Sequence, residues 1–139
     1  MSGEREAAKT AGEKALPLLE ARIRERPDDL YAMTELSWVY IALGRNTDAL
    51  RLARQAADSM PIEKDAQSGT YFHNGFAQIE AWAGRPEDAV KRLRHLLSIP
   101  AGQSVSIVVL KLDPIWDPIR DRPDFQQLLF GTELIGPNK

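Results

Sequence analysis

Two stretches of the chain, residues 42–61 and 83–100, share one order of apolar and polar positions. Each begins with a glycine turn, continues with apolar residues three or four apart, and closes with a proline. This spacing is typical of one face of an amphipathic helix. When the stretches are aligned on their glycines, small or apolar residues coincide: Ala49 with Ala89, Ala53 with Leu93, and Ala56 with Leu96. The pattern therefore predicts the same helix twice.

An earlier copy of this helix is "EKALPLLEARIRERP", residues 13–27, in which Ala15 matches Ala49 and Pro27 matches Pro61. The interval between the second and third copies of this helix is six residues longer than the interval between the first and second copies. We place the additional residues in 61–70, because the Pro, Asp, Ser and Gly of "PIEKDAQSGT" favour a loop. Such an insertion costs little, since the entropy of loop closure grows slowly with length.

Residues 29–43 and about 70–83 are predicted to form a first helix in each unit. In 29–43 the apolar residues lie on both faces: Met33, Leu36, Ser37 and Tyr40 on one, and Tyr31, Trp38 and Ile41 on the other. A helix that is apolar nearly all round is expected between neighbouring helices rather than on a surface.

Glycines mark the predicted turn between the two helices of each unit. Gly44 and Gly84 stand where a helix ends in a left-handed residue, which glycine adopts without steric penalty. Pro86 suits the first turn of the next helix, because the amide that it lacks would be unpaired there. In the preceding unit, Asn46 or Thr47 is the expected helix cap.

A helix, a glycine turn, a second helix and a closing proline, repeated at a period of about 34 residues, resemble the tetratricopeptide repeat. The better copy has the family's pattern at Met33, Leu36, Ser37, Tyr40, Gly44, Ala49, Ala53, Ala56 and Pro61. The second copy is degraded, because Glu80 stands at the aromatic position and Pro100 comes one residue early. Small residues at the repeat positions would let two helix backbones approach closely within each hairpin.

The tail, "VLKLDPIWDPIRDRPDFQQLLFG", resembles the segment that ends tetratricopeptide arrays in large bacterial proteins, including regulators with a kinase or cyclase domain upstream. Residues 104–112 would supply a third first helix, although "SVSIVVL" taken alone favours a strand. Pro114 and Pro123 suit helix starts, with Asp113 as a cap. Seven apolar residues are expected to cover the end of the stack: Leu112, Ile115, Trp116, Ile119, Phe125, Leu128 and Leu129.

The resemblance implies an all-α, right-handed solenoid of helical hairpins with a C-terminal helical cap, formed by a single domain of residues 1–139. Its expected parts are a partial repeat (1–27), a repeat (28–61), a repeat with a loop insertion (62–100), and a third first helix with the end cap (101–139). Residues 1–14 are too short for a full first helix before Ala15. Either the chain comes from a longer parent or the N-terminal helix runs on with a kink at Pro17.

In the family that these repeats resemble, a peptide groove is lined by first-helix residues that face away from the second helices. Carried over position by position, the groove residues are Tyr31, Thr34, Trp38, Tyr71, Asn74, Gln78 and Trp82. Aromatic area with amide donors and acceptors is typical of an interface core. Trp38 and Trp82 could instead belong to the core between repeats. No Lys or Arg occupies these positions, so we expect no clamp for a partner's C-terminal carboxylate.

Composition and motifs argue against several other functions. The chain has no cysteine. Its 18 Lys and Arg against 20 Asp and Glu give a net charge of −2, and this charge favours neither nucleic acid nor a membrane surface as partner. His73 and His95 lie on different predicted helices without a second ligand at metal spacing. A basic cluster is better explained as a solvated face than as a phosphate site: Arg51, Arg54, Lys91, Arg92, Arg94 and His95.

The sequence therefore predicts a cytoplasmic protein-interaction module that binds a peptide or helix, with no catalytic residue, metal or cofactor. Its N-terminus lacks the apolar run of a signal peptide. The alternative is an oligomerisation or regulatory segment of a larger bacterial signalling protein. In that case an uncovered N-terminal end would leave room for a homodimer.

Overall fold

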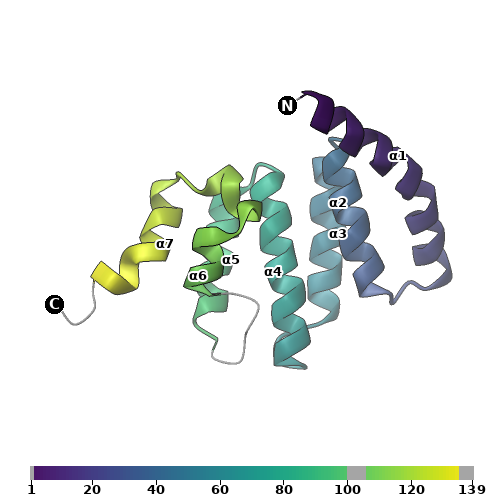
Figure 1. The fold of residues 1–139 in the computed structure, drawn as a ribbon. Helices are drawn as coiled ribbons and strands as arrows, with labels where there is room; N and C mark the ends of the chain where they lie inside the picture. The colour runs from purple at the N-terminus through teal and green to yellow at the C-terminus, as the bar shows by residue number, and fades with distance from the viewer. Residues whose placement is uncertain (1, 100–105, 135–139) are drawn as a thin grey trace.

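The computed structural model describes residues 2–99 and 106–134, which form helices joined by short turns, with no strand among them. In chain order the elements are α1 (Ser2–Glu25), α2 (Leu30–Ala42), α3 (Asn46–Ser59), α4 (Ala66–Trp82), α5 (Pro86–Leu97), α6 (Ile107–Leu112), the 3₁₀ helix η1 (Pro114–Ile119) and α7 (Pro123–Leu134) (Figure 1). The all-α prediction is confirmed. None of the described helices is both long and apolar enough to cross a membrane. Pro100 and residues 101–105 and 135–139 of the predicted last segment lie outside the described residues.

Helices α2 and α3, and likewise α4 and α5, form hairpins that turn at a left-handed glycine. The backbone angle φ is 77° at Gly44 and 81° at Gly84, as predicted. The amide of Arg45 donates to the carbonyl of Tyr40 at 2.8 Å, and that of Arg85 to Glu80 at 2.9 Å. The two turns therefore close with the same hydrogen bond, which satisfies a carbonyl at the end of the first helix.

The helices follow one another across the molecule in chain order, with α1 at one end and α7 at the other (Figure 1). The two larger clusters of buried apolar side chains lie among α1 to α4 and among α4, α5, α6, η1 and α7. Ser37, Ala49 and Ala89 are fully buried, so the small residues lie where they let the helices of a hairpin approach closely. Helix α4 contributes to both clusters and joins the two halves of the molecule.

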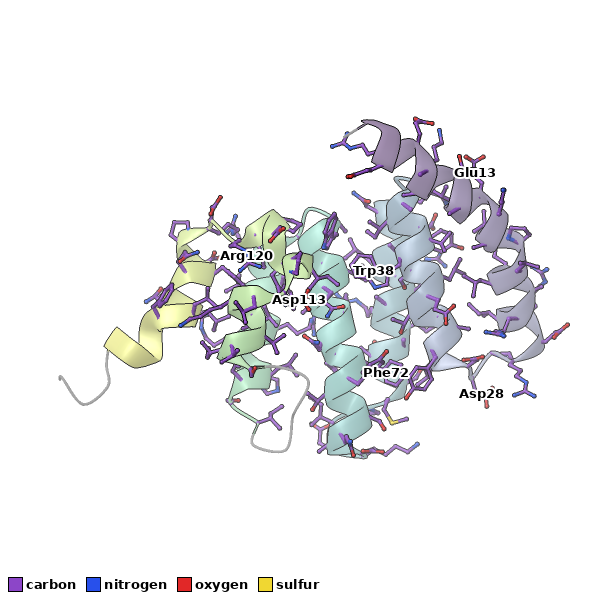
Figure 2. The ribbon with its side chains drawn as sticks, viewed as in Figure 1. Glu13, Asp28, Trp38, Phe72, Asp113 and Arg120 are labelled. Atoms are coloured by element: carbon purple, nitrogen blue, oxygen red, sulfur yellow. The ribbon has the colours of Figure 1, made fainter. Side chains whose placement is uncertain are left out.

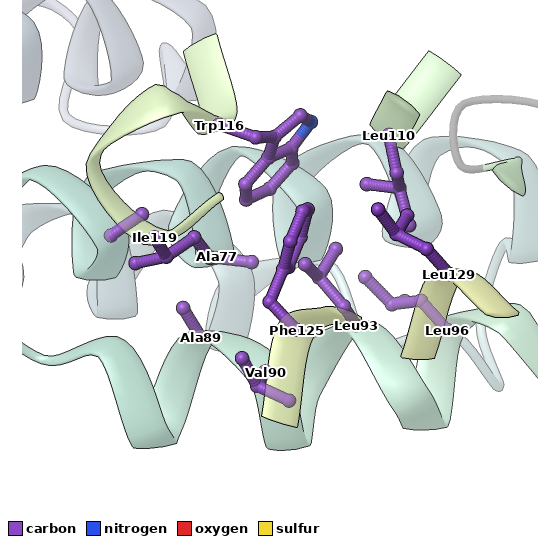
Figure 3. Close-up of a cluster of buried hydrophobic side chains, with 11 residues drawn as sticks. Ala77, Ala89, Val90, Leu93, Leu96, Leu110, Trp116, Ile119, Phe125 and Leu129 are labelled. Atoms are coloured by element: carbon purple, nitrogen blue, oxygen red, sulfur yellow. The ribbon is translucent and has the colours of Figure 1, made fainter. Parts of the chain in front are cut away.

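The predicted end cap is built by η1 and α7. Trp116 and Ile119 of η1 and Phe125 and Leu129 of α7 are buried against α4 and α5 (Figure 3), and the rings of Trp116 and Phe125 stack 6.3 Å apart. Ile115 and Leu128 are partly buried against the same cluster. The expectation for Leu112 is wrong, because it lies at the last turn of α6 with 74% of its surface exposed.

Residues 107–112 are helical although their isoleucine and valines belong to a run that favours a strand. Ser106 caps α6, since its hydroxyl accepts a hydrogen bond from the amide of Val109 at 3.2 Å. Leu110 is buried in the cluster of α5 and α7. Tertiary contacts thus override local propensity. Residues 104 and 105 of the predicted helix lie outside the described residues.

The six additional residues of the second repeat are shared between a loop and a longer helix. Helix α4 has 17 residues against 13 in α2, and it begins at Ala66, earlier than expected. Asp65 caps α4, because its carboxylate accepts hydrogen bonds from the amides of Gln67 and Ser68, both at 3.1 Å. These bonds, that of Ser68 foremost, lower the pKa of Asp65.

The prediction that Asn46 or Thr47 caps α3 is wrong. Neither Asn46 nor Thr47 caps this helix: Arg45 occupies the cap position without a side-chain hydrogen bond, and Asn46 is already helical. Instead, Asp48 in the first turn binds Arg45 and Arg51, each at 2.8 Å, and these bonds lower its pKa.

Helix α1 runs through Pro17 rather than ending there. Figure 1 shows α1 as a curved helix, as expected where a proline removes a backbone hydrogen bond.

Candidate functional site

The residues predicted to line a groove come together on α2 and α4. The rings of Tyr31 and Tyr71 lie 5.6 Å apart, and those of Trp38 and Trp82 lie 6.2 Å apart in an edge-to-face arrangement. Figure 2 shows Trp38 between the α2/α3 hairpin and α4. Each aromatic pair joins one residue of α2 to one residue of α4, so ring contacts link the two repeats at two places.

A pocket of about 320 Å³ lies on this surface between α2 and α4. It is lined by Thr34, Glu35, Trp38, Tyr71, Asn74, Gly75 and Gln78. Tyr31 and Trp82 do not line the pocket, but they contact Tyr71 and Trp38, which do. The seven predicted residues therefore lie together on one surface, and the pocket volume is at the lower end of the range for ligand pockets.

Two residues that line the pocket, Glu35 and Gly75, are not among those predicted from the sequence. Both occupy the same position of their respective repeats, and each lies four residues after a predicted groove tyrosine. Helical spacing from Tyr31 and Tyr71 would have found them. Gly75 creates much of the space, since a Cβ atom there would meet only the Thr34 methyl group, at 3.9 Å.

The aromatic side chains of the groove differ in burial. Tyr31, Tyr71 and Trp82 expose 59%, 45% and 44% of their surface, which is high for large apolar residues. The indole N–H of Trp82 donates to the carbonyl of Ile115 at 2.7 Å, which fixes its ring at the end of the groove. Trp38 is half-buried and packs against the cluster of α1 to α4. Trp38 thus combines the core and groove roles, whereas Trp82 lies at the surface.

One buried polar atom in the pocket has no hydrogen-bond partner among the residues that the structure describes. The Oδ1 atom of Asn74 is buried and accepts no hydrogen bond from the described part of the chain. Buried polar atoms without a partner are uncommon in folded proteins. The hydroxyl of Thr34 is already used, because it donates to the carbonyl of Leu30 at 3.1 Å. Glu35 is exposed and forms no ion pair with any described residue.

A larger hollow of about 1020 Å³ adjoins this pocket on the side of α1. It lies between α1 and α2, and it shares Glu35 with the pocket between α2 and α4. Leu18 lines it and exposes 74% of its surface. The hollowed surface therefore extends from α1 to α4, long enough to contact more than one side chain of a bound segment.

The histidines lie away from this groove and show no metal geometry. His73 and His95 line a separate hollow with Arg92 of α5. Partial burial lowers the pKa of His73, and the nearby Arg92 charge lowers it further. Glu80, on the same helix as His73, is bound through both carboxylate oxygens by Arg92. No cluster of three or more potential metal ligands occurs among the described residues.

Comparison with known proteins yields no relative: no family model, no curated protein and no solved structure matches the chain. The resemblance to tetratricopeptide repeats stays a prediction drawn from the residues. The geometry of the groove itself must therefore support any functional proposal.

Proposed function

We propose that this chain is a protein-interaction module that binds a peptide or helix in the groove between α2 and α4. The observation that carries the proposal is the pocket of about 320 Å³ between two aromatic pairs, with the unpartnered Asn74 Oδ1 inside it. Exposed rings offer apolar area to a partner side chain, and a buried acceptor offers a hydrogen bond to a backbone or side-chain N–H. The proposal includes no catalytic step.

The same proposal includes a right-handed, tetratricopeptide-like solenoid with the C-terminal cap. It is supported by the recurring glycine turns at Gly44 and Gly84, the buried alanines, and the chain-order succession of the helices (Figure 1). In such a fold the first helices of consecutive hairpins line a common inner wall. The cytoplasmic location expected from the sequence stays part of this proposal.

The test is selection of a random peptide library, displayed on phage, against the full chain. Peptides that bind in the groove should lose binding to the double variant Tyr31→Ala and Tyr71→Ala. Val108 and Leu112 of α6 are apolar residues outside the groove that are more exposed than the two tyrosines, so Val108→Ala with Leu112→Ala is the control. A selection in which every peptide binds the tyrosine variant as well as the unchanged chain would overturn the proposal.

The alternative, an oligomerisation or regulatory segment of a larger bacterial signalling protein, has one supporting observation. Leu18 on α1, at one end of the row of helices, exposes 74% of its surface and lines the larger hollow. Light scattering distinguishes the two functions. A stable dimer that Leu18→Glu dissociates would favour self-association, whereas a monomer at high concentration would exclude it.

A further inference from the structure

The pocket between α2 and α4 carries one negative charge and one buried acceptor atom without a partner in the described part of the chain. Glu35 is the one charged residue among those that line it, and its carboxylate has no ionic partner among the described residues. Asn74 presents a buried carbonyl oxygen without a donor. A partner group that carries several N–H donors and a positive charge would satisfy both.

Aromatic rings form the other walls of the pocket. Trp38 and Tyr71 line it, and each is held by a second ring, Trp82 and Tyr31 respectively. The faces of tryptophan and tyrosine attract cations, and they attract guanidinium groups by stacking as well. Aromatic faces and acceptors thus favour the same kind of ligand.

We propose that this pocket binds an arginine side chain of the partner peptide. The inference rests on the proposed peptide-binding function and names the residue that the groove recognises. A guanidinium group has five donors in one plane, so it can bind the Glu35 carboxylate and Asn74 Oδ1 together while it stacks on a ring. A lysine ammonium group is a point charge that stacks less well, and a carboxylate would be repelled by the negative charge of Glu35.

The glycine at position 75 makes the entry of such a side chain possible. A Cβ atom at Gly75 would point into open space, with the Thr34 methyl group at 3.9 Å as its nearest contact. Glu35 occupies the matching position of the preceding repeat. One repeat therefore supplies the charge, and the next supplies the space opposite it.

The experiment uses peptides selected from the random phage library and three variants of the full chain. Gly75→Met adds a large side chain at a position where a Cβ atom meets only the Thr34 methyl group, and Glu35→Gln removes the charge but keeps the shape. Glu13→Gln, at an exposed site on α1 outside the pocket (Figure 2), makes the same charge change as a control. Each selected arginine is also replaced by citrulline, which keeps the shape without the charge, and by lysine. Circular dichroism checks that every variant is folded.

The expected result is an arginine at one fixed position of the selected peptides. Binding should weaken about tenfold or more for citrulline and for Glu35→Gln, an effect between those of an exposed and a desolvated ion pair. Lysine should bind more weakly than arginine, Gly75→Met should lose binding, and Glu13→Gln should not change it.

Other outcomes separate this inference from the proposed function. Peptides that need Tyr31 and Tyr71 but carry no arginine, or that tolerate citrulline or Glu35→Gln, overturn the arginine pocket and leave peptide binding standing. The same holds for peptides that accept lysine without loss or that bind Gly75→Met normally. A library without any peptide that depends on the two tyrosines overturns both.

Discussion

Arg92 of α5 and Glu80 of α4 form an ion pair over the ring of Phe76, in which the carboxylate is buried and the guanidinium group is partly exposed. Two nitrogens of the guanidinium group donate to the two carboxylate oxygens at 2.8 and 3.2 Å, and its central carbon lies 4.0 Å from the Phe76 ring centroid. Glu80 exposes only 2% of its side chain. In the preceding repeat the matching position is Tyr40, which is also buried. The pair thus explains how the second repeat packs without the expected aromatic residue.

Replacement of Arg92 should test the strength of this pair. Arg92→Met keeps the apolar stem but leaves Glu80 buried without a cation, so we expect the free energy of unfolding to fall by about 3 kcal/mol. Arg94→Met, at an exposed position on the same helix, is the control, and its effect should be small. Urea unfolding measures both. Equal losses for the two variants would contradict a structural role for the pair.

The double variant Arg92→Met with Glu80→Leu should regain most of the stability that Arg92→Met loses. A buried ion pair is often replaceable by apolar residues of similar size, because its attraction mainly offsets the cost of removing two charges from water. The same urea experiment measures the recovery. If the double variant is as unstable as Arg92→Met alone, the loss comes from packing around Phe76 rather than from an unpaired charge.

The hairpins could be predicted from the sequence because their determinants recur along the chain. Gly44 and Gly84 end helices in the left-handed region, and the alanines at matching positions are buried between helices. The pairing of Arg92 with Glu80 could not be predicted in this way. It exists in one repeat only, and it joins residues whose contact depends on how α5 packs against α4.

Two glycines of α4 should respond in opposite ways to alanine. A Cβ atom at Gly69 would lie 2.7 Å from Ile62 Cα, since the loop before α4 crosses the helix there, so Gly69→Ala should cost about 2 kcal/mol. Gly75→Ala meets only the Thr34 methyl group at 3.9 Å and should stabilise the helix by up to about 1 kcal/mol. Thermal unfolding compares the two. A stabilised Gly69→Ala variant would show that the loop does not hold its position over α4.

The groove was predictable only in part, and Gly75 shows why. The aromatic and amide residues stand at positions that the repeat family uses, so their side chains could be placed from the pattern. A pocket depends also on what is missing, and a glycine inside a helix carries no pattern of its own. Only the three-dimensional neighbours of position 75 show that the space there is open.

His73 should make stability fall in mildly acidic solution. Partial burial, reinforced by Arg92, places its pKa below the ordinary value of 6.5, while Asp58 and Glu63 oppose the shift. The unfolded chain therefore takes up a proton at higher pH than the folded chain does. The free energy of unfolding should decline as the pH falls below about 6.5, until the pH passes the folded pKa.

The variants His73→Gln and His95→Gln separate this effect from general acid sensitivity. His73→Gln should flatten the decline between neutral and mildly acidic pH, whereas His95→Gln, at an exposed position in the same hollow, should keep it. Urea unfolding at a series of pH values measures the slope. An unchanged slope in His73→Gln would assign the decline to other groups.

Arg120 should hold the short helix α6 in place. Its guanidinium group donates to the carbonyls of Leu110, Lys111 and Asp113 at 3.0, 2.7 and 2.6 Å, at the C-terminal end of α6. The negative end of the helix dipole also stabilises a cation at this position. No side-chain pattern predicts these bonds, because all three acceptors are backbone atoms. They explain why a segment of strand-forming residues is held as a helix.

Arg120→Met should therefore lower the free energy of unfolding by about 2 kcal/mol, as expected when charged hydrogen bonds to backbone carbonyls, two of them partly buried, are lost. In this variant, amide hydrogen exchange should become faster in residues 106–113, whereas exchange in α4 should change less. Arg122→Met is the control, because Arg122 pairs with the neighbouring Asp124 and with no carbonyl of α6 in the described part of the chain. Arg120→Lys should recover only part of the loss, since one ammonium group cannot reach all three carbonyls. If exchange in α6 is unchanged by Arg120→Met, the buried Leu110 alone is sufficient to hold this helix against the rest of the end cap.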